Sequence, residues 1–239
     1  MYLIGVNIMK MKFFRRNGKL SIPMLLISLA VAAVVYFTQQ PAYCDSVMNV
    51  PEFSGEAYVV INKNQPEFTQ SDHTVVAYEY YSPLDILGRC GYGMACLGQE
   101  LMPTEDRGAI GMIKPSGWHT VKYDFVDGKY LYNRCHLIGF QLAGENANEQ
   151  NLITGTRYMN TEGMLPFENM VADYITETDN HVLYRVTPVY DGDNLLARGV
   201  QIEALSMEDN GKGICFNVYC YNAQPGVIIN YATGDSREE

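Results

Sequence analysis

One stretch of the chain holds side chains that together could hydrolyse a phosphodiester. It contains Asn133-Arg134-Cys135-His136, followed by Asn151, Asn160 and Glu168. A hard divalent cation such as Mg²⁺ takes oxygen ligands and keeps several waters, so one amide oxygen can suffice as its protein ligand. A histidine nearby can accept the proton of an attacking water, because the reference pKa of histidine is about 6.5.

Each of these residue types suggests a distinct role. We expect Asn160 to bind Mg²⁺, or Mn²⁺ in its place, and Glu168 to hold the waters of the metal through hydrogen bonds. His136 is the expected general base. We expect Asn151 to hold the imidazole or the loop beside it, and Arg134 to contact a phosphate oxygen.

At these positions the sequence resembles the bacterial DNA/RNA non-specific endonuclease family, of the ββα-metal (His-Me finger) type. That family carries an Asp-Arg-Gly-His motif, then an Asn-Ile/Leu-Thr turn, a metal-binding Asn and a Glu about two helical turns later. Here residues 133–136 keep the Arg and the His but replace the Asp and the Gly, whereas the NLITGT turn, Asn160 and Glu168 match in order and spacing. The segments RCHLIG, NLITGTRYMN and LPFENMVADY resemble an exported Gram-positive subgroup.

The resemblance covers roughly residues 55–232 and extends to function. It implies a general base at His136, a metal ligand at Asn160 and a supporting carboxylate at Glu168. It also implies DNA and RNA as substrates.

Each site residue also has a structural interpretation. His136 alone could be a hydrogen-bonded core histidine, Asn160 a helix N-cap, and Glu168 a solvated helix residue. Cys135 and His136 are adjacent and face opposite sides of a strand, which argues against a thiol nucleophile with its base. The shared spacing favours the metal-dependent site over these alternatives.

Some features outside this stretch have weaker interpretations. The triplet 106–108 (Asp-Arg-Gly) imitates the start of the family motif, but an alanine follows it, so it supplies no base. His73 and His181 lack convergent partners and are expected at the surface. Trp118 and the tyrosines of 78–81 and 130–132 could line a substrate groove or stack bases, although packing is the default role of aromatic residues on a sheet.

The expected strands and helix predict an α+β fold, with a mostly antiparallel sheet that carries one central helix. The resemblance implies that this fold contains a ββα-metal (His-Me finger) nuclease core. Apolar residues recur at helical spacing over 161–176 and predict one helix there. Pro166 places the first regular turn nearby, and Asn160 is expected where the chain enters the helix. The stretch 82–116 contains many glycines and is expected to be a loop. Runs typical of strands occur at 57–62, 74–80, 130–138, 182–190, 195–205 and 214–221.

The N-terminus is basic and then apolar. The run 22–37 suits either a signal peptide or a membrane anchor, and its basic flank places the remainder outside the cytoplasm. We therefore expect residues 1–44 to contain this leader and the start of a linker, and 50–235 to form the nuclease domain, secreted or anchored on the outer face of the membrane. A disulfide between Cys90 and Cys96 is credible in that compartment, whereas Cys215 and Cys220 should not pair with each other.

Charge separates two classes of function. Residues 45–239 carry 12 basic and 27 acidic side chains, a formal charge of −15, which excludes a coat protein that neutralises nucleic acid broadly. An enzyme that meets a phosphodiester briefly, through a metal ion and one or two arginines, remains compatible. The alternative is a catalytically weak, surface-tethered nucleic-acid-binding or adhesion module on the same fold, and metal dependence would distinguish the two.

Overall fold

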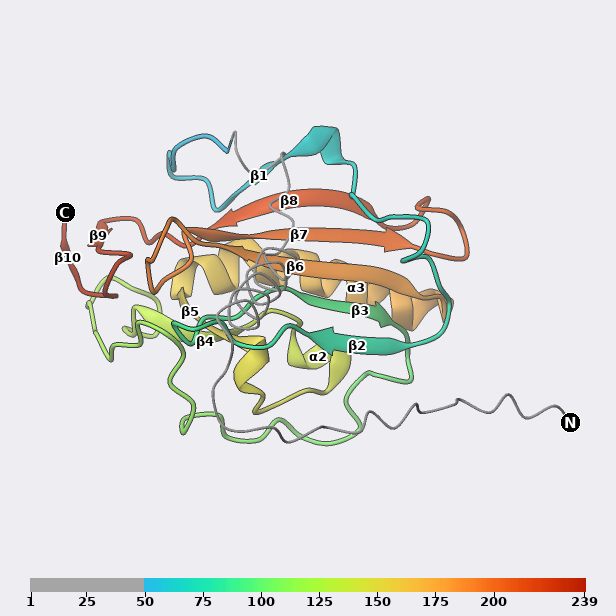
Figure 1. Cartoon of the computed structure of the whole chain (residues 1–239), viewed down its shortest axis with the longest axis horizontal. Helices are drawn as coiled ribbons and strands as arrows, with labels where there is room; N and C mark the ends of the chain where they lie inside the picture. The colour runs from blue at the N-terminus through green and yellow to red at the C-terminus, as the bar shows by residue number, and fades with distance from the viewer. Residues whose placement is uncertain (1–49) are drawn as a thin grey trace, which may run out of the picture. The chain divides into compact units, whose positions relative to one another are not determined.

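The largest element is a six-stranded antiparallel sheet with the strand order β1-β8-β7-β6-β3-β2 (Figure 1). The computed structural model describes residues 50–239, which all belong to one compact unit. The strands of this sheet are β1 (Tyr58–Val60), β2 (Tyr78–Tyr81), β3 (Gly93–Leu97), β6 (Val182–Val189), β7 (Gly199–Ser206) and β8 (Cys215–Tyr221). Antiparallel pairing throughout agrees with the predicted fold class.

A separate hairpin and the helix that follows it form the predicted ββα unit. Strand β4 (Tyr132–His136) pairs with β5 (Leu152–Thr156), so that His136 lies opposite Leu152. The connection contains the short helix α2 (Phe140–Ala143) and the 3₁₀ turn η3 (Glu149–Asn151). After β5 come the π-helical turn η4 (Met159–Met164) and helix α3 (Leu165–Thr178). Pro166 lies in the first turn of α3, as predicted, because proline needs no backbone donor there.

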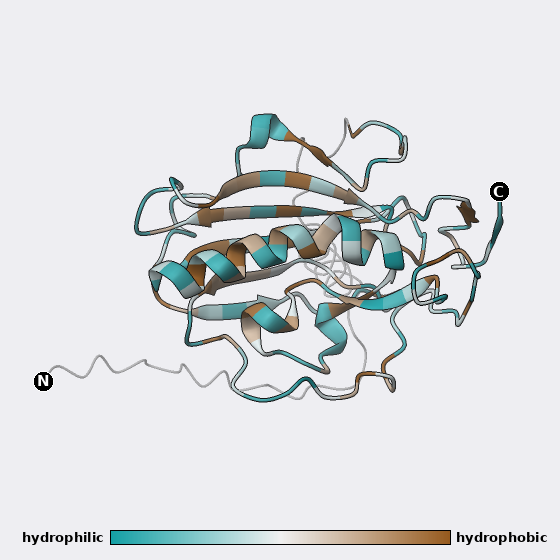
Figure 2. Ribbon diagram, turned by 180° about the vertical axis from the view of Figure 1, so that it is seen from behind, coloured by the Kyte–Doolittle hydropathy of each residue, from teal (hydrophilic) through white to brown (hydrophobic). Residues whose placement is uncertain are grey.

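Helix α3 covers one face of the large sheet (Figure 2). Its residues Phe167, Val171 and Ile175 recur at helical spacing and join the main core with residues of β3, β6, β7 and β8. Cys135 of the hairpin belongs to the same core, so the hairpin and helix α3 both pack against the large sheet. This packing fixes the relative positions of β4 and α3.

Three segments differ from the sequence-based expectation. The expected loop 82–116 contains β3, which is buried on both faces and therefore lacks the alternation that marks a half-buried strand. Strand β5 occupies the segment expected as a turn. The first strand stops at Val60, because residues Asn62–Asn64 form a 3₁₀ turn (η2) with positive φ angles. A small sheet of β9 (Val227–Ile229) and β10 (Ser236–Glu238) ends the chain.

Other expectations concern cysteines and the leader. In the described part of the chain all five cysteines are free, so the expected bridge between Cys90 and Cys96 is wrong. The Cys90 thiol instead donates to the carbonyls of Glu149 and Leu152, while Cys96 lies in β3. The leader 1–44 lies outside the described residues. Within 50–239 no helix has the length and apolar character needed to cross a membrane.

The expectation that His181 lacks partners is also wrong. Its Nδ1 lies 2.6 Å from Glu208 Oε1, and its Nε2 lies 3.4 Å from Glu100 Oε1. Burial alone would lower the pKa of His181, but the hydrogen bond and charge of Glu208, together with Glu100, outweigh it and raise that pKa. The histidine therefore joins loops at the ends of three strands.

Candidate active site

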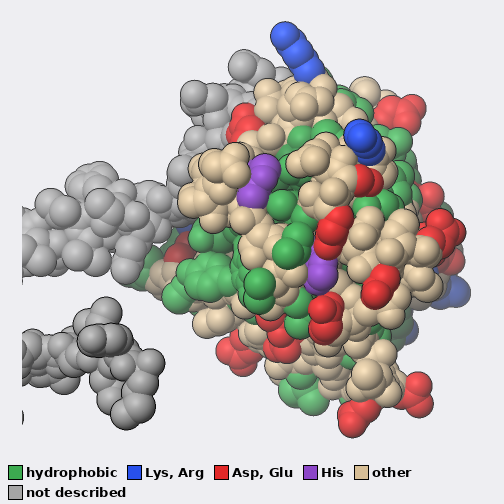
Figure 3. Space-filling view, turned by 90° about the vertical axis from the view of Figure 1, so that its right-hand side faces the viewer, with side chains coloured by type: hydrophobic (Ala, Val, Ile, Leu, Met, Phe, Trp, Pro, Cys, Tyr) green, Lys and Arg blue, Asp and Glu red, His purple; other side chains and the backbone are tan. Residues whose placement is uncertain are grey.

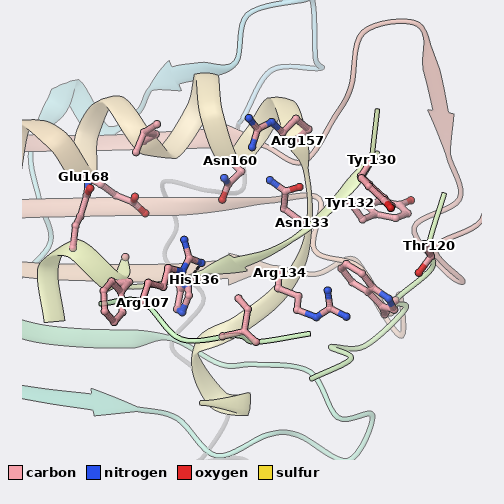
Figure 4. A pocket seen from close by; sticks show the side chains of 16 residues that line it. Arg107, Thr120, Tyr130, Tyr132, Asn133, Arg134, His136, Arg157, Asn160 and Glu168 are labelled. Carbon is pink, nitrogen blue, oxygen red and sulfur yellow. Dashed lines mark hydrogen bonds between the residues drawn. The ribbon is translucent and has the colours of Figure 1, made fainter. Parts of the chain in front are cut away.

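A cavity of about 660 Å³ lies between β4, the start of α3 and the loop before β4 (Figure 4). Four of the predicted residues line it: Arg134, His136, Asn160 and Glu168. The fifth, Asn151, is fully buried and is not among the lining residues. The other lining side chains include Arg107, Trp118, Thr120, Tyr130, Tyr132, Asn133, Phe140, Gln141 and Arg157.

His136 is held at the end of β4 with its ring turned into this cavity. Its side chain is 6% exposed, and Nε2 lies 2.8 Å from the carbonyl oxygen of Asn146. A carbonyl can only accept, so Nε2 carries the proton, and the lone pair of Nδ1 accepts from Arg107 Nη2 at 3.2 Å. Burial and the charge of Arg107 lower the pKa of His136, although the Asn146 hydrogen bond acts the other way. The imidazole is therefore neutral and has a basic nitrogen at neutral pH.

Asn151 fixes the backbone just beyond His136. Its Oδ1 accepts from the N–H of Ile138 at 2.9 Å, and its Nδ2 donates to the carbonyl of Ile138 at 3.1 Å. Its own carbonyl accepts from the N–H of Leu137. Of the two roles expected for Asn151, the geometry supports holding the loop and not the imidazole.

Glu168 reaches the cavity from the first turn of α3. Gly139 lies directly against its carboxylate: a Cβ added there would lie 2.9 Å from the Glu168 carboxyl carbon. Burial raises the pKa of Glu168 to about 7, although the charge of Arg107 lowers it. The absence of a side chain at Gly139 thus leaves room for the carboxylate.

Asn160 lies in the π-helical turn and is not a helix N-cap. The N-cap of η4 is Tyr158 and that of α3 is Met164, whereas the backbone carbonyl of Asn160 accepts from Leu165. Such π turns occur often at functional sites. The Asn160 side chain makes no hydrogen bond to another residue in 50–239, and Figure 4 shows it near Asn133 on the cavity wall.

This donor set fits a hydrated hard cation. Asn160 offers a free amide oxygen, and Glu168 offers a carboxylate beside the space that Gly139 leaves. Among the described residues there is no group of three or more His, Cys, Asp and Glu that could enclose a metal ion. The site is therefore suited to a metal that keeps most of its water ligands.

Arg134 points away from His136 toward the opposite end of the cavity (Figure 4). Its guanidinium carbon lies 3.9 Å from the centre of the Trp118 ring, and its Nη2 donates to the Gly111 carbonyl at 2.9 Å. Its Nε donates to the carbonyl of Ile113. The guanidinium thus anchors the loop before β4 while it forms part of the cavity wall.

Two arginines in the cavity were not predicted. Arg107 places Nη2 3.2 Å from His136 Nδ1, although its triplet seemed to imitate the motif without function. Arg157 lines the wall beside Asn160 and pairs with Asp127 at 2.7 Å. The Asp-Arg-Gly triplet singled out Arg107 in the sequence. The position of Arg107 beside His136 could not be predicted, because it depends on the path of the long loop between β3 and β4. Arg157 lies in the segment NLITGTRYMN, which carries the resemblance, but no role was assigned to it there.

Cys135 is accommodated by Gly155, which lies on the neighbouring strand β5 opposite Asn133. Cys135 is fully buried in the core on the side opposite His136, as the strand alternation predicts. Gly155 provides the space, because a Cβ there would lie 2.4 Å from the Cys135 sulfur. The cysteine therefore occupies the core without changing the cavity wall.

The comparisons with known proteins agree on one family. The model of the family described as DNA/RNA non-specific endonuclease matches residues 69–208. A deoxyribonuclease from Streptococcus dysgalactiae subsp. equisimilis is 36% identical over 110 residues, which is 44% of this chain and 32% of that protein. The chain therefore spans about a third of the length of this relative.

Solved structures show the same fold. NucA from Streptococcus agalactiae with a magnesium ion bound superposes with a TM-score of 0.70 at 25% identity, covering 82% of this chain and 94% of NucA. The Sda1 nuclease with a bound zinc ion gives a TM-score of 0.64 at 24% identity, covering 77% of this chain and 97% of Sda1. The likeness to Sda1 is one of fold alone.

Proposed function

Because the chain belongs to the DNA/RNA non-specific endonuclease family, we propose that it is a metal-dependent endonuclease that cuts DNA and RNA without sequence specificity. The observation that carries the proposal is one cavity lined by a neutral buried histidine, a free amide and a carboxylate. We propose residues 50–235 as its catalytic domain.

The local charge of the cavity supports a phosphodiester substrate. Of the side chains that line it, Arg107, Arg134 and Arg157 are basic and Glu168 is the acidic one. The rest of the protein is acidic, with red side chains scattered over the face in Figure 3. A backbone phosphate is therefore attracted to the cavity and repelled elsewhere.

His136 supplies the base in this proposal. Its Nδ1 takes the proton of a water as the water oxygen bonds to phosphorus and the leaving oxygen departs. The carbonyl of Asn146 keeps the proton on Nε2, and a water takes the place that Arg107 occupies beside Nδ1. Arg107 can then turn to the phosphate.

We propose Asn160 as the protein ligand of Mg²⁺ and Glu168 as the acceptor of hydrogen bonds from its waters. When bound there, Mg²⁺ stabilises negative charge on the phosphate and on the leaving oxygen. NucA contains magnesium, which supports a divalent cation in this fold. We expect Mn²⁺ to replace Mg²⁺, since both prefer oxygen ligands.

We also propose that the protein acts outside the cytoplasm. The basic and apolar leader carries this proposal, either as a cleaved signal peptide or as an anchor through residues 22–37. The substrate would then be nucleic acid in the surroundings of the cell. Fractionation of cells that express the full chain would show whether the protein is released, membrane-bound or retained.

The test of the activity uses full-length protein on supercoiled plasmid and on an RNA of mixed sequence. We expect cleavage of both with Mg²⁺ or Mn²⁺ and none with EDTA, and we expect Asn160→Ala to remove it. Glu177→Ala, on the exposed side of α3, is the control and should cleave normally. Folded protein that cuts neither substrate with any divalent metal would reject the proposal, and cleavage of plasmid alone would reject its RNA part.

A further inference from the structure

The cavity extends beyond the catalytic residues to an aromatic end. Thr120, Tyr130 and Tyr132 line this end, on the side of Arg134 away from Glu168 (Figure 4), and the Trp118 ring lies against the Arg134 guanidinium. A strand extends in both directions from a phosphate at His136, and this wall offers a path for one of them. The aromatic end is therefore in a position to meet the neighbouring nucleotide.

Tyr130 is the most exposed of these three aromatic side chains. Tyr132 is 3% exposed and its hydroxyl donates to the carbonyl of Gly234. The guanidinium of Arg134 covers the ring of Trp118. Tyr130 is 47% exposed, and its hydroxyl makes no hydrogen bond within the described residues.

A cation accompanies the Tyr130 ring. Lys122 lies opposite Tyr130 across an antiparallel bridge, and its Nζ is 4.4 Å from the ring centre. An exposed ring beside an ammonium group matches a nucleotide, because every base has a π face and every linkage carries a negative charge.

We propose that Tyr130 and Lys122 form a nucleotide subsite, in which Tyr130 stacks an unpaired base of the substrate and Lys122 contacts the adjacent phosphate. This inference rests on the proposed function and makes it more specific. A base in an intact duplex is already stacked and paired, so the subsite favours single-stranded or locally opened nucleic acid. Tyr130 and Lys122 act as specificity-determining residues and not as catalysts.

A binding experiment tests the subsite separately from hydrolysis. The full-length protein carries His136→Ala and is kept in EDTA, so that the probe is not cut. The probes are a labelled single-stranded oligothymidylate of about a dozen nucleotides and the same backbone with abasic sugars, and fluorescence anisotropy gives each Kd. The variants are Tyr130→Ala, Tyr130→Trp and Lys122→Ala, and Tyr80→Ala is the control because Tyr80 is 46% exposed on the edge strand β2.

The expected pattern separates stacking from charge. Tyr130→Ala should weaken binding of oligothymidylate about tenfold and leave the abasic probe unchanged, whereas Tyr130→Trp should retain affinity for both. Lys122→Ala should weaken both probes, and the Tyr80 control neither. A Tyr130→Ala protein that binds oligothymidylate as the Tyr80 control does, or that loses equal affinity for both probes, would overturn the inference.

Failure of the proposed function gives a different result. If Tyr130 controls binding but the wild-type protein cuts no nucleic acid with Mg²⁺, then the subsite stands and the hydrolytic function fails. If the protein cuts plasmid but its affinity for oligothymidylate does not depend on Tyr130, then the function stands and the subsite fails. Protein that does not bind oligothymidylate at all rejects the subsite as well.

Discussion

At the scale of single residues, the site depends on which nitrogen of His136 is protonated. The Asn146 carbonyl binds Nε2–H, and burial keeps the pKa of the ring below its ordinary value. The basic Nδ1 then faces the cavity and Arg107. The chemical type of His136 was predictable from its motif, but the tautomer depends on a backbone oxygen ten residues away.

Gly139 provides a sharp test at this scale. Its φ and ψ of −57° and 144° suit alanine, but the new Cβ would displace the flexible end of Glu168. We expect Gly139→Ala to lower kcat/KM on plasmid by about tenfold or more, with the thermal midpoint nearly unchanged. Steady-state kinetics and a melting curve measure both quantities. Normal activity in this variant would show that the position of the Glu168 carboxylate is unimportant.

At the scale of elements, Asn151 connects η3 to the chain that follows β4. Its amide satisfies both backbone groups of Ile138, which are buried. We expect Asn151→Ala to lower the free energy of unfolding by about 2 to 4 kcal/mol and to reduce kcat, because two buried backbone groups lose their partners. Urea denaturation with a parallel activity assay checks this, and His136→Ala is the comparison that should lose activity with little loss of stability. Unaltered stability of Asn151→Ala would contradict the structural role.

The His181 cluster gives a prediction about pH. Its partners raise the pKa of His181 in the folded state, so the folded protein binds this proton more tightly than the unfolded chain. The stabilisation is therefore complete below the unfolded pKa of about 6.5, while the glutamates are ionised, and is lost as pH rises through the higher folded value. We expect the difference in melting temperature between wild type and His181→Gln to be larger at pH 6 than at pH 9. A melting-temperature difference between the two proteins that grows with pH would contradict the raised pKa of folded His181.

The sequence implied the ββα unit through its resemblance to the family, and apolar spacing predicted the helix of that unit, whereas β5 was expected as a turn. It failed at β3, where burial on both faces removes the alternation, and at His181, whose partners come from distant loops. The helix start at Pro166 was predictable, but the π-helical turn that presents Asn160 was not, because no local residue pattern specifies it. Site chemistry followed from the motif, while Arg107 and Arg157 required the folded chain.

At the scale of the whole molecule, the protein carries a net negative charge, whereas its cavity is lined by three arginines. Such a molecule can neutralise only a few phosphates at once. We expect the logarithm of the affinity for duplex DNA to fall with the logarithm of salt concentration with a slope of about −3, and Arg107→Ala to reduce its magnitude by about 1. Titrations of the His136→Ala protein between low and moderate salt measure these slopes. A slope twice as steep would indicate a broad basic surface that this account excludes.

The central claim is that His136 acts as the base in metal-dependent hydrolysis. The most direct measurement is the rate of plasmid cleavage with Mg²⁺ by wild-type protein and by His136→Ala, with melting curves of both. We predict that His136→Ala keeps its fold and loses at least about a hundredfold in rate, the usual contribution of a positioned base. Folded His136→Ala that cleaves plasmid as fast as the wild type would contradict the account.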